Sequence, residues 1–216
     1  MTESAITHAD ALDWLARQEP GAATAICFDP PYAVGTPVRG KEDGAAGSVF
    51  GPFGFLHRTM SLCTPALRPG GIVAIFTDWR RLADMGYIAS TVGLRPSACV
   101  AWVRSRPGTG GLFRASWDPI PIASRGTPDA IDQAAIRNVI ETLDDVVDAN
   151  YPARRTHPYQ NAVAVYEHIL RRVCRPGDLV LDPFSGSGSS RVACEKLELV
   201  FRGCDIDPAY AETGDV

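Results

Sequence analysis

The sequence predicts an α/β fold with a mainly parallel sheet covered by helices on both faces. Strand-length apolar runs alternate with stretches of helical periodicity along the 216 residues, and this alternation is typical of parallel sheets. Asp29, Asp182 and Asp205 each end one of the apolar runs. Because parallel strands bring their carboxyl ends to one edge, where ligands bind, we expect a ligand site there. The length fits one domain over residues 1–216.

The expected elements follow one another with few interruptions. Helices are expected over 9–18, near 54–67, up to about 91, near 161–174 and from about 188. Strands are expected at ATAICFD (23–29), IVAIFTD (72–78) after the turn RPGG, ACVAWVR (98–104), DPIPIAS (118–124), DLVLD (178–182) and LVFRGCD (199–205). The stretch 126–156 is ambiguous, because the apolar residues between Ile136 and Val147 recur with helical spacing while RNVIE could form a short strand.

Composition narrows the class of protein. A net charge of -4 argues against a uniformly basic nucleic-acid binder but leaves room for local arginine clusters. No apolar run is long enough to span a membrane and the N-terminus lacks signal-peptide features, so we expect a cytoplasmic protein. The six cysteines lie at least ten positions apart, which predicts buried reduced thiols rather than a zinc or other metal site.

A glycine-rich turn joins the strand ending at Asp182 to the following helix, in the segment LVLDPFSGSGSSRVACEKL. Such a turn lets backbone N–H groups and a helix N-terminus approach a ligand closely. The turn matches neither the phosphate-loop pattern GxxxxGK[ST] of nucleoside triphosphate sites nor the dinucleotide-binding pattern GxGxxG. Asp205 follows about twenty residues later, where an acid commonly accepts hydrogen bonds from ribose hydroxyls. These features predict a site for a nucleoside with little or no phosphate, with a plain tight turn as the competing interpretation.

Three segments together resemble a known family: DPPY (29–32), DPFSGSG (182–188) and GCDIDPAY (203–210). They are similar to the signature segments of S-adenosylmethionine-dependent DNA amino-methyltransferases, and their order is similar to the circularly permuted β group of that family. RTHPYQN (155–161) resembles the family's THPTQKP segment and HADAL (8–12) its GDAL segment. Asn161-Ala162 and His8-Ala9 depart from those patterns. The resemblance implies a Rossmann-like methyltransferase fold with a seven-stranded, circularly permuted sheet, and S-adenosyl-L-methionine as cofactor.

The resemblance also assigns residues to the cofactor. The glycine turn would surround its methionine part, Asp205 would hold the ribose, Asp10 would meet the adenine edge, and a segment before residue 161 would complete the pocket. The cofactor-binding residues implied in this way are Asp10, Ala11, Asp29, Thr156, His157, Gln160, Asp182, Pro183, Phe184, Ser185, Gly186, Ser187, Gly188, Ser189, Asp205 and Ile206.

The DPPY segment would carry the chemistry. The Asp29 carboxylate and the Pro30 carbonyl can each accept a hydrogen from a target amine, which concentrates electron density on its nitrogen. Pro31 stiffens the turn, and Tyr32 offers a flat face to the base. The structural alternative is a proline turn that ends a strand. DPPY favours adenine N6; cytosine N4, an RNA or protein amide, or an inactive DNA- or nucleoside-binding module remain alternatives.

DNA is the expected partner, with the target base flipped out of the duplex or single-stranded. Residues 33–52, rich in glycine, are expected to form a lid over that base. Target recognition is expected from the insert at 126–156, which is short and acidic. We therefore predict a short recognition sequence, help from a partner in a homodimer, or a preference for single strands.

Overall fold

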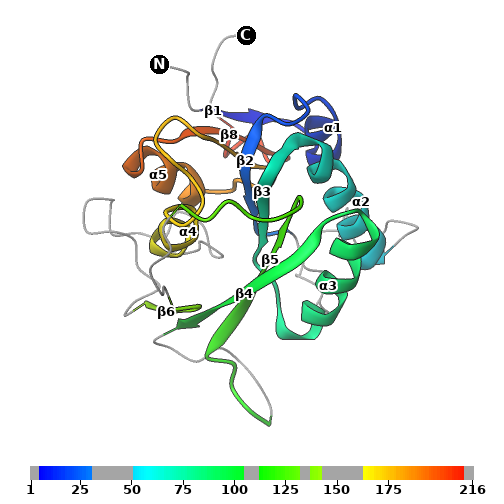
Figure 1. Ribbon diagram of the computed structural model, residues 1–216, viewed down its shortest axis with the longest axis vertical. Coiled ribbons are helices and arrows are strands. Elements are labelled where there is room, and N and C mark those ends of the chain that lie inside the picture. The colour runs from blue at the N-terminus through cyan, green and yellow to red at the C-terminus, as the bar shows by residue number, and fades with distance from the viewer. Residues whose placement is uncertain (1–4, 31–50, 105–111, 132–136, 143–162, 212–216) are drawn as a thin grey trace.

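A computed structural model describes residues 5–30, 51–104, 112–131, 137–142 and 163–211, and its sheet has eight strands among these residues (Figure 1). The strands are β1 (Ala5–His8), β2 (Ala23–Phe28), β3 (Leu67–Ile75), β4 (Arg95–Arg104), β5 (Trp117–Ser124), β6 (Val139–Thr142), β7 (Leu179–Asp182) and β8 (Val200–Asp205). The helices are α1 (Ala11–Ala16), α2 (Gly51–Ala66), the 3-10 turn η1 (Trp79–Arg81), α3 (Leu82–Thr91), α4 (Val163–Leu170) and α5 (Ser189–Lys196).

The strand order is β1-β8-β7-β2-β3-β5-β4-β6. Strand β5 is antiparallel to both of its neighbours, β3 and β4, and every other described pairing is parallel. The predicted α/β fold with a mainly parallel sheet is therefore confirmed. The sheet has one strand more than the seven expected, because the short β1 pairs with the edge of β8.

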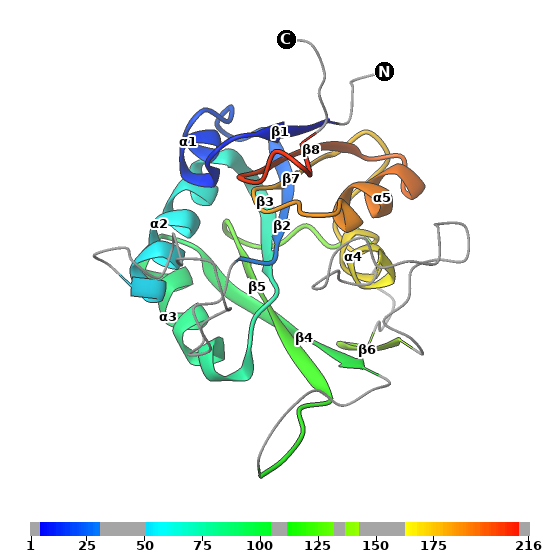
Figure 2. The same cartoon turned by 180° about the vertical axis from the view of Figure 1, so that it is seen from behind.

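Helices cover both faces of the sheet, as Figures 1 and 2 show from opposite sides. Helices α1, α2 and α3 share one apolar core with one face of the sheet, and α4 and α5 share a second core with the other face. Strand β2 contributes Ala25 and Cys27 to the second core and Ile26 and Phe28 to the first. Burial on both faces explains why this strand is a continuous apolar run.

The chain leaves β2 and β7 in opposite directions across the sheet. From β2 it passes through α2 to β3 on one side, and from β7 it passes through α5 to β8 on the other. The connecting helices lie on opposite faces, so the carboxyl ends of β2 and β7 open at the switch point where ligands bind in sheets of this kind. Asp29 and Asp182 lie at these two ends.

Strand pairing overturns one local expectation from the sequence and decides between two alternatives at another place. RPGG was expected as a turn before the second strand, but it lies inside β3, where Gly70 has a φ of +81° and the pairing with β2 shifts register. The last three residues of RNVIE belong to a strand and not to a helix: β6 pairs in parallel with β4 from Ala101–Val139 to Arg104–Thr142.

All six cysteines are free, and five of them are buried. Burial raises the pKa of the Cys174 thiol to about 12 and raises the pKa of Cys27 well above its usual value. The five buried thiols are thus core residues whose reactive thiolate form is disfavoured, and Cys99 is half-buried. No helix among the described ranges is long and apolar enough to cross a membrane.

Candidate cofactor and active site

Parallel pairing brings the three predicted acids to one edge of the sheet. Register pairs Ile26 with Leu181, Asp182 with Gly203, and His8 with Asp205. Asp29 therefore follows β2 directly beside the end of β7, and Asp205 ends β8 on the other side of β7. The charges of Asp29 and Asp205 both contribute to raising the pKa of Asp182, so the three carboxyl groups form one electrostatic cluster.

Asp182 is the buried centre of this cluster, with 1 % of its surface exposed. Desolvation by burial raises its pKa from 3.8 to about 7, against the opposing effect of two hydrogen bonds. Its Oδ2 accepts from Ser190 Oγ at 2.5 Å and its Oδ1 from the backbone N–H of Phe184 at 2.9 Å. Asp182 therefore fixes the start of the glycine turn and the first turn of α5.

The glycine turn itself depends on two residues in the left-handed region. Gly186 has a φ of +47° and Gly188 a φ of +82°, which side chains rarely tolerate. The Gly188 carbonyl accepts the first hydrogen bond of α5 from Val192, at 3.0 Å. The hydroxyl of Ser189 is buried and has no hydrogen-bond partner among the described residues. The turn thus presents a helix N-terminus and an unused hydroxyl at the carboxyl edge.

Asp205 closes the other side of the turn. Its Oδ2 accepts from the backbone N–H of Gly186 at 2.8 Å, and its Oδ1 accepts from that of Asp207 at 2.9 Å. Each carboxylate oxygen has a second lone pair that stays available to a ligand hydroxyl. Ile206 follows with 68 % of its surface exposed, an apolar face beside the acid.

Gly203 makes the close approach of β8 to the turn possible. A Cβ at this position would collide with Ser185 Oγ and with the ring of Phe201. Ser185 is fixed there because its N–H donates to the Cys204 carbonyl at 3.0 Å and its hydroxyl to the Asp182 carbonyl at 2.9 Å. Sequence reasoning missed Gly203 and Ser190 as parts of this site; their positions beside Asp205 and at the start of a helix were the available signals.

Asp10 and Ala11 lie at the start of α1, next to the same edge. The Ala9 N–H donates to the Asp205 carbonyl oxygen at 3.0 Å, which brings the start of α1 close to the end of β8. Asp10 is exposed and caps α1, since its Oδ1 accepts from the N–H groups of Leu12 at 2.9 Å and Asp13 at 3.2 Å. Ala11 is buried in the core with α1.

Phenylalanine contacts join the glycine turn to the strand that leads to DPPY. The ring of Phe184 lies 5.6 Å from that of Phe28 and 5.9 Å from that of Phe55 on α2. Asp29 follows Phe28 directly, and Pro30 is buried. Pro31, Tyr32, Thr156, His157, Gln160 and the expected lid at 33–52, apart from its final residues, lie outside the described residues.

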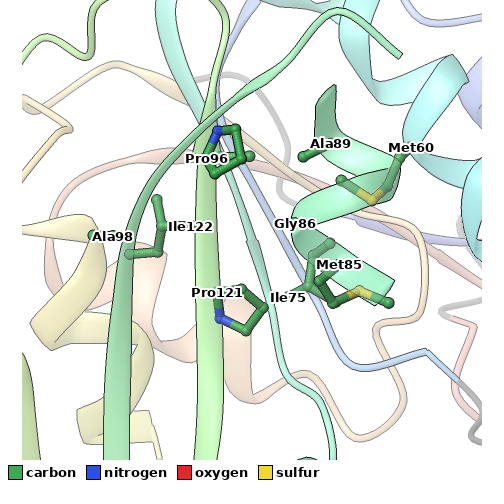
Figure 3. A pocket seen from close by; sticks show the side chains of 10 residues that line it. Met60, Ile75, Met85, Gly86, Ala89, Pro96, Ala98, Pro121 and Ile122 are labelled. Carbon is green, nitrogen blue, oxygen red and sulfur yellow. The ribbon is translucent and has the colours of Figure 1, made fainter. Parts of the chain in front are cut away.

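An apolar pocket elsewhere in the molecule has no part in this arrangement. It lies between α3 and the strands β4 and β5, and its lining includes Met60, Met85, Pro96 and Pro121 (Figure 3). None of its lining residues is polar, and none belongs to the acidic cluster. The described residues also contain no group of His, Cys, Asp and Glu that could hold a metal ion.

The acidic cluster of this α/β protein lies at the switch point of its sheet, where folds of this class bind their ligands. Residues 23–215 match a family model for N6/N4 methyltransferases, described as DNA methylase. The chain belongs to this DNA methylase family, as its signature segments predicted. The family uses S-adenosyl-L-methionine, which agrees with the predicted cofactor.

Relatives and solved structures are distant in sequence and similar over most of their length. The chain is 24% identical to the type II methyltransferase M.HpaI of Haemophilus parainfluenzae over 94% of this chain and 70% of the relative. It is 23% identical to the type II methyltransferase M2.DpnII of Streptococcus pneumoniae over 95% of this chain and 85% of the relative.

Among solved structures, the crystal structure of the M1.HpyAVI–SAM complex has a TM-score of 0.69 at 21% identity, covering 96% of each chain. TTHA0409 of Thermus thermophilus, a putative DNA modification methylase in complex with S-adenosyl-L-methionine, has a TM-score of 0.70 at 18% identity, covering 96% of this chain and 91% of that one. The cytosine-N4-specific PvuII DNA methyltransferase has a TM-score of 0.77 at 14% identity, covering 97% of this chain and 87% of that one.

Proposed function

We propose that this chain transfers the methyl group of S-adenosyl-L-methionine to the exocyclic N6 amine of adenine in DNA. The observation that carries the proposal is the position of Asp29, beside the glycine turn and in the same electrostatic cluster as Asp182 and Asp205. When bound, the cofactor supplies an electrophilic methyl group on a sulfonium. The chain has to bind that cofactor, hold the amine and exclude water.

The described residues fit S-adenosyl-L-methionine. The Asp205 carboxylate keeps lone pairs for ribose hydroxyls, and the exposed Ile206 offers an apolar face to the adenine ring. The buried Ser189 hydroxyl, with no described partner, is a candidate donor to the methionine carboxylate. Roles for Asp10, Thr156, His157 and Gln160 remain predictions.

The Asp29 carboxylate and the Pro30 carbonyl are the proposed acceptors of the two amine hydrogens. An aromatic amine is a poor nucleophile because its lone pair is delocalised into the ring. Hydrogen bonds to both hydrogens concentrate charge on nitrogen as it attacks the methyl carbon. Pro31 and Tyr32 would stiffen the turn and stack on the base, and remain predictions.

The choice of adenine rests on the DPPY sequence, which adenine enzymes of the family usually carry. The test uses the purified chain, labelled S-adenosyl-L-methionine and DNA containing all sequence contexts, followed by digestion to nucleosides and mass analysis. N6-methyladenine is the expected product. N4-methylcytosine would overturn the choice of base and keep the chemistry, and label in RNA or protein but not in DNA would overturn the substrate.

The setting of the reaction also belongs to this proposal. We infer a cytoplasmic enzyme of the restriction–modification type, since M.HpaI and M2.DpnII are type II methyltransferases. Target recognition by 126–156 and a homodimer remain predictions. Within that insert, residues 126–131 lie at the amino ends of the strands, opposite to Asp29, because the Asp129 N–H donates to the Gly70 carbonyl at 3.1 Å. Recognition contacts from these residues are therefore not part of the proposal.

A further inference from the structure

The two exposed tryptophans of the described chain both lie at the end of the sheet that carries Asp29. Trp79 is 58 % exposed and Trp117 is 41 % exposed, whereas Trp14 and Trp102 are at most 9 % exposed. Large aromatic rings are mostly covered in folded proteins, so exposed ones beside a ligand site point to a partner.

Backbone geometry puts the two tryptophans at the same end of neighbouring strands. Strands β3 and β5 pair antiparallel through Ala74–Ile122, and the ladder continues beyond the strand with a hydrogen bond of 3.2 Å from Thr77 N–H to the Pro119 carbonyl. Trp79 lies two residues beyond Thr77, at the start of η1, and Trp117 lies two residues before Pro119, so both tryptophans lie at the same end of the β3–β5 pair.

The same edge carries the proposed methyl acceptor site. The Phe76 N–H donates to the Phe28 carbonyl at 2.9 Å, so the chain that leads to Trp79 starts beside the residue preceding Asp29. Residues 112–116, which precede Trp117, project from the body of the protein, at the bottom of Figures 1 and 2. The two tryptophans therefore lie on the β3–β5 side of Asp29, at the same end of the sheet.

Trp79 is held in its exposed position by its neighbours. Asp78 caps η1 by accepting from the Arg80 N–H at 2.8 Å, and its other oxygen pairs with the Arg80 guanidinium at 2.8 Å. The guanidinium carbon lies 5.3 Å from the centre of the Trp79 ring, within cation–π range. A ring ordered in this way can accept a second flat group with little further loss of entropy.

The charge around the two rings favours a polyanion. Arg80, Arg81 and Arg104 each pair with one aspartate, and these surface pairs are weak enough to exchange for phosphate. Arg114 is exposed and has no ion pair with any described residue. The four arginines and their three partner aspartates therefore carry one excess positive charge, whereas the whole chain has a net charge of -4. A protein partner would match the apolar rings, but a nucleic acid matches both the rings and the arginines.

We propose that Trp79 and Trp117 form an aromatic clamp that stacks on unpaired bases of the DNA strand next to the target base. The clamp positions the strand and does not touch the reacting atoms. This inference rests on the proposed function for its choice of DNA, and it assigns DNA contacts to the residue that follows β3 in η1 and to the first residue of β5, outside the acidic insert at 126–156.

The test measures binding of fluorescently labelled single-stranded and duplex oligonucleotides to Trp79→Ala, Trp117→Ala and the conservative Trp79→Phe and Trp117→Phe. Each alanine variant should weaken single-strand binding by about fivefold to 150-fold, the effect of losing one stacked base. The phenylalanine variants should stay within about threefold of the wild type, because a flat ring remains. Tyr87→Ala is the matched control, since Tyr87 is 65 % exposed on α3 and should leave the affinity unchanged.

Intrinsic fluorescence gives a readout that a merely structural role would not move. DNA should quench the tryptophan emission of the wild type, and the double variant Trp79→Phe, Trp117→Phe should lose that quenching because Trp14 and Trp102 are buried. The affinity for S-adenosyl-L-methionine, measured by calorimetry, should be unchanged in all variants, and the KM for DNA should rise in the alanine variants more than kcat falls.

The outcomes separate the two proposals. Methyl transfer to DNA with wild-type affinity and quenching in the variants would overturn the clamp alone. Binding and quenching by DNA with no methyl transfer from the wild type would overturn the function and keep the clamp. A wild type that binds no DNA, or rings that govern self-association of the chain instead of DNA affinity, would also overturn the clamp.

Discussion

The backbone N–H of Gly186 donates a hydrogen bond of 2.8 Å to Oδ2 of Asp205, across 19 positions of sequence. This bond joins the glycine turn after β7 to the end of β8, and it orients the carboxylate that we assign to the ribose. The turn and the acid therefore act as one unit.

Asp205→Ala should weaken cofactor binding. The substitution removes both the proposed ribose acceptor and the bond to Gly186, so we expect the Kd for S-adenosyl-L-methionine to rise by about tenfold to 100-fold, the effect of losing one charge-assisted hydrogen bond. Isothermal titration calorimetry measures it. The matched control is Asp207→Ala, which removes a neighbouring acid that accepts from the Ala209 N–H. Equal losses in both variants would contradict a specific role for Asp205.

Asp29→Asn should separate chemistry from cofactor binding. Loss of the charged acceptor removes stabilisation that develops only as the amine attacks, so kcat should fall by about 10²- to 10³-fold. The Kd for S-adenosyl-L-methionine should change little. Single-turnover methyl transfer at saturating DNA and cofactor measures the first effect and calorimetry the second. A variant that keeps its full rate would show that the turn at Asp29 is only structural.

Gly203→Ala should destabilise the protein through the site itself. The added methyl group would collide with Ser185 Oγ and Phe201, so β8 or the glycine turn must shift. We expect a loss of about 1–3 kcal/mol in the free energy of unfolding, typical of overpacking. Gly86→Ala is the control: it lies inside α3 with open space around it and should stabilise the protein by up to about 1 kcal/mol. Urea unfolding of both variants provides the comparison, and equal effects would be inconsistent with a close approach at Gly203.

Asp182 should make stability depend on pH. Its pKa is raised from 3.8 to about 7, so below pH 4 both the folded and the unfolded state hold the proton. As pH rises from about 4 to about 7 the unfolded chain releases a proton that the folded state retains, and the free energy of unfolding falls. The decrease is at most about 4 kcal/mol, from about 1.4 kcal/mol per pKa unit.

Asp182→Asn should remove that dependence. An asparagine can still accept from the Phe184 N–H and donate to Ser190 Oγ, but it does not titrate in this range. Urea unfolding of both proteins between pH 4 and pH 8 should show that the free energy of unfolding of the variant increases relative to that of the wild type as pH rises. Parallel curves would mean that Asp182 ionises in the folded state as easily as in the unfolded state.

The sequence predicted the acids at the strand ends because the signal is local. An apolar run that ends in Asp29, Asp182 or Asp205 identifies a buried strand and its carboxyl end without any knowledge of its neighbours. The glycine turn was predicted for the same reason, since Gly186 and Gly188 adopt the left-handed conformations that only glycine adopts readily.

Strand pairing decided what the sequence left open or missed. The segment around Val139 forms the strand β6 in spite of its helical spacing, because β4 offers an unpaired edge to it. The four residues of β1 carry too weak a pattern to be predicted alone and form a strand only beside β8. The need for glycine at position 203 depends on how closely Ser185 and Phe201 approach it.

The sequence by itself therefore determined the fold class, the family and the three acids, because periodicity, turn chemistry and short motifs are properties of neighbouring residues. Only the tertiary structure decided that those acids share one electrostatic cluster and that Trp79 and Trp117 lie exposed at the same end of the sheet. Desolvation and exposure depend on which residues the folded chain brings together, and that information is distributed over the whole sheet.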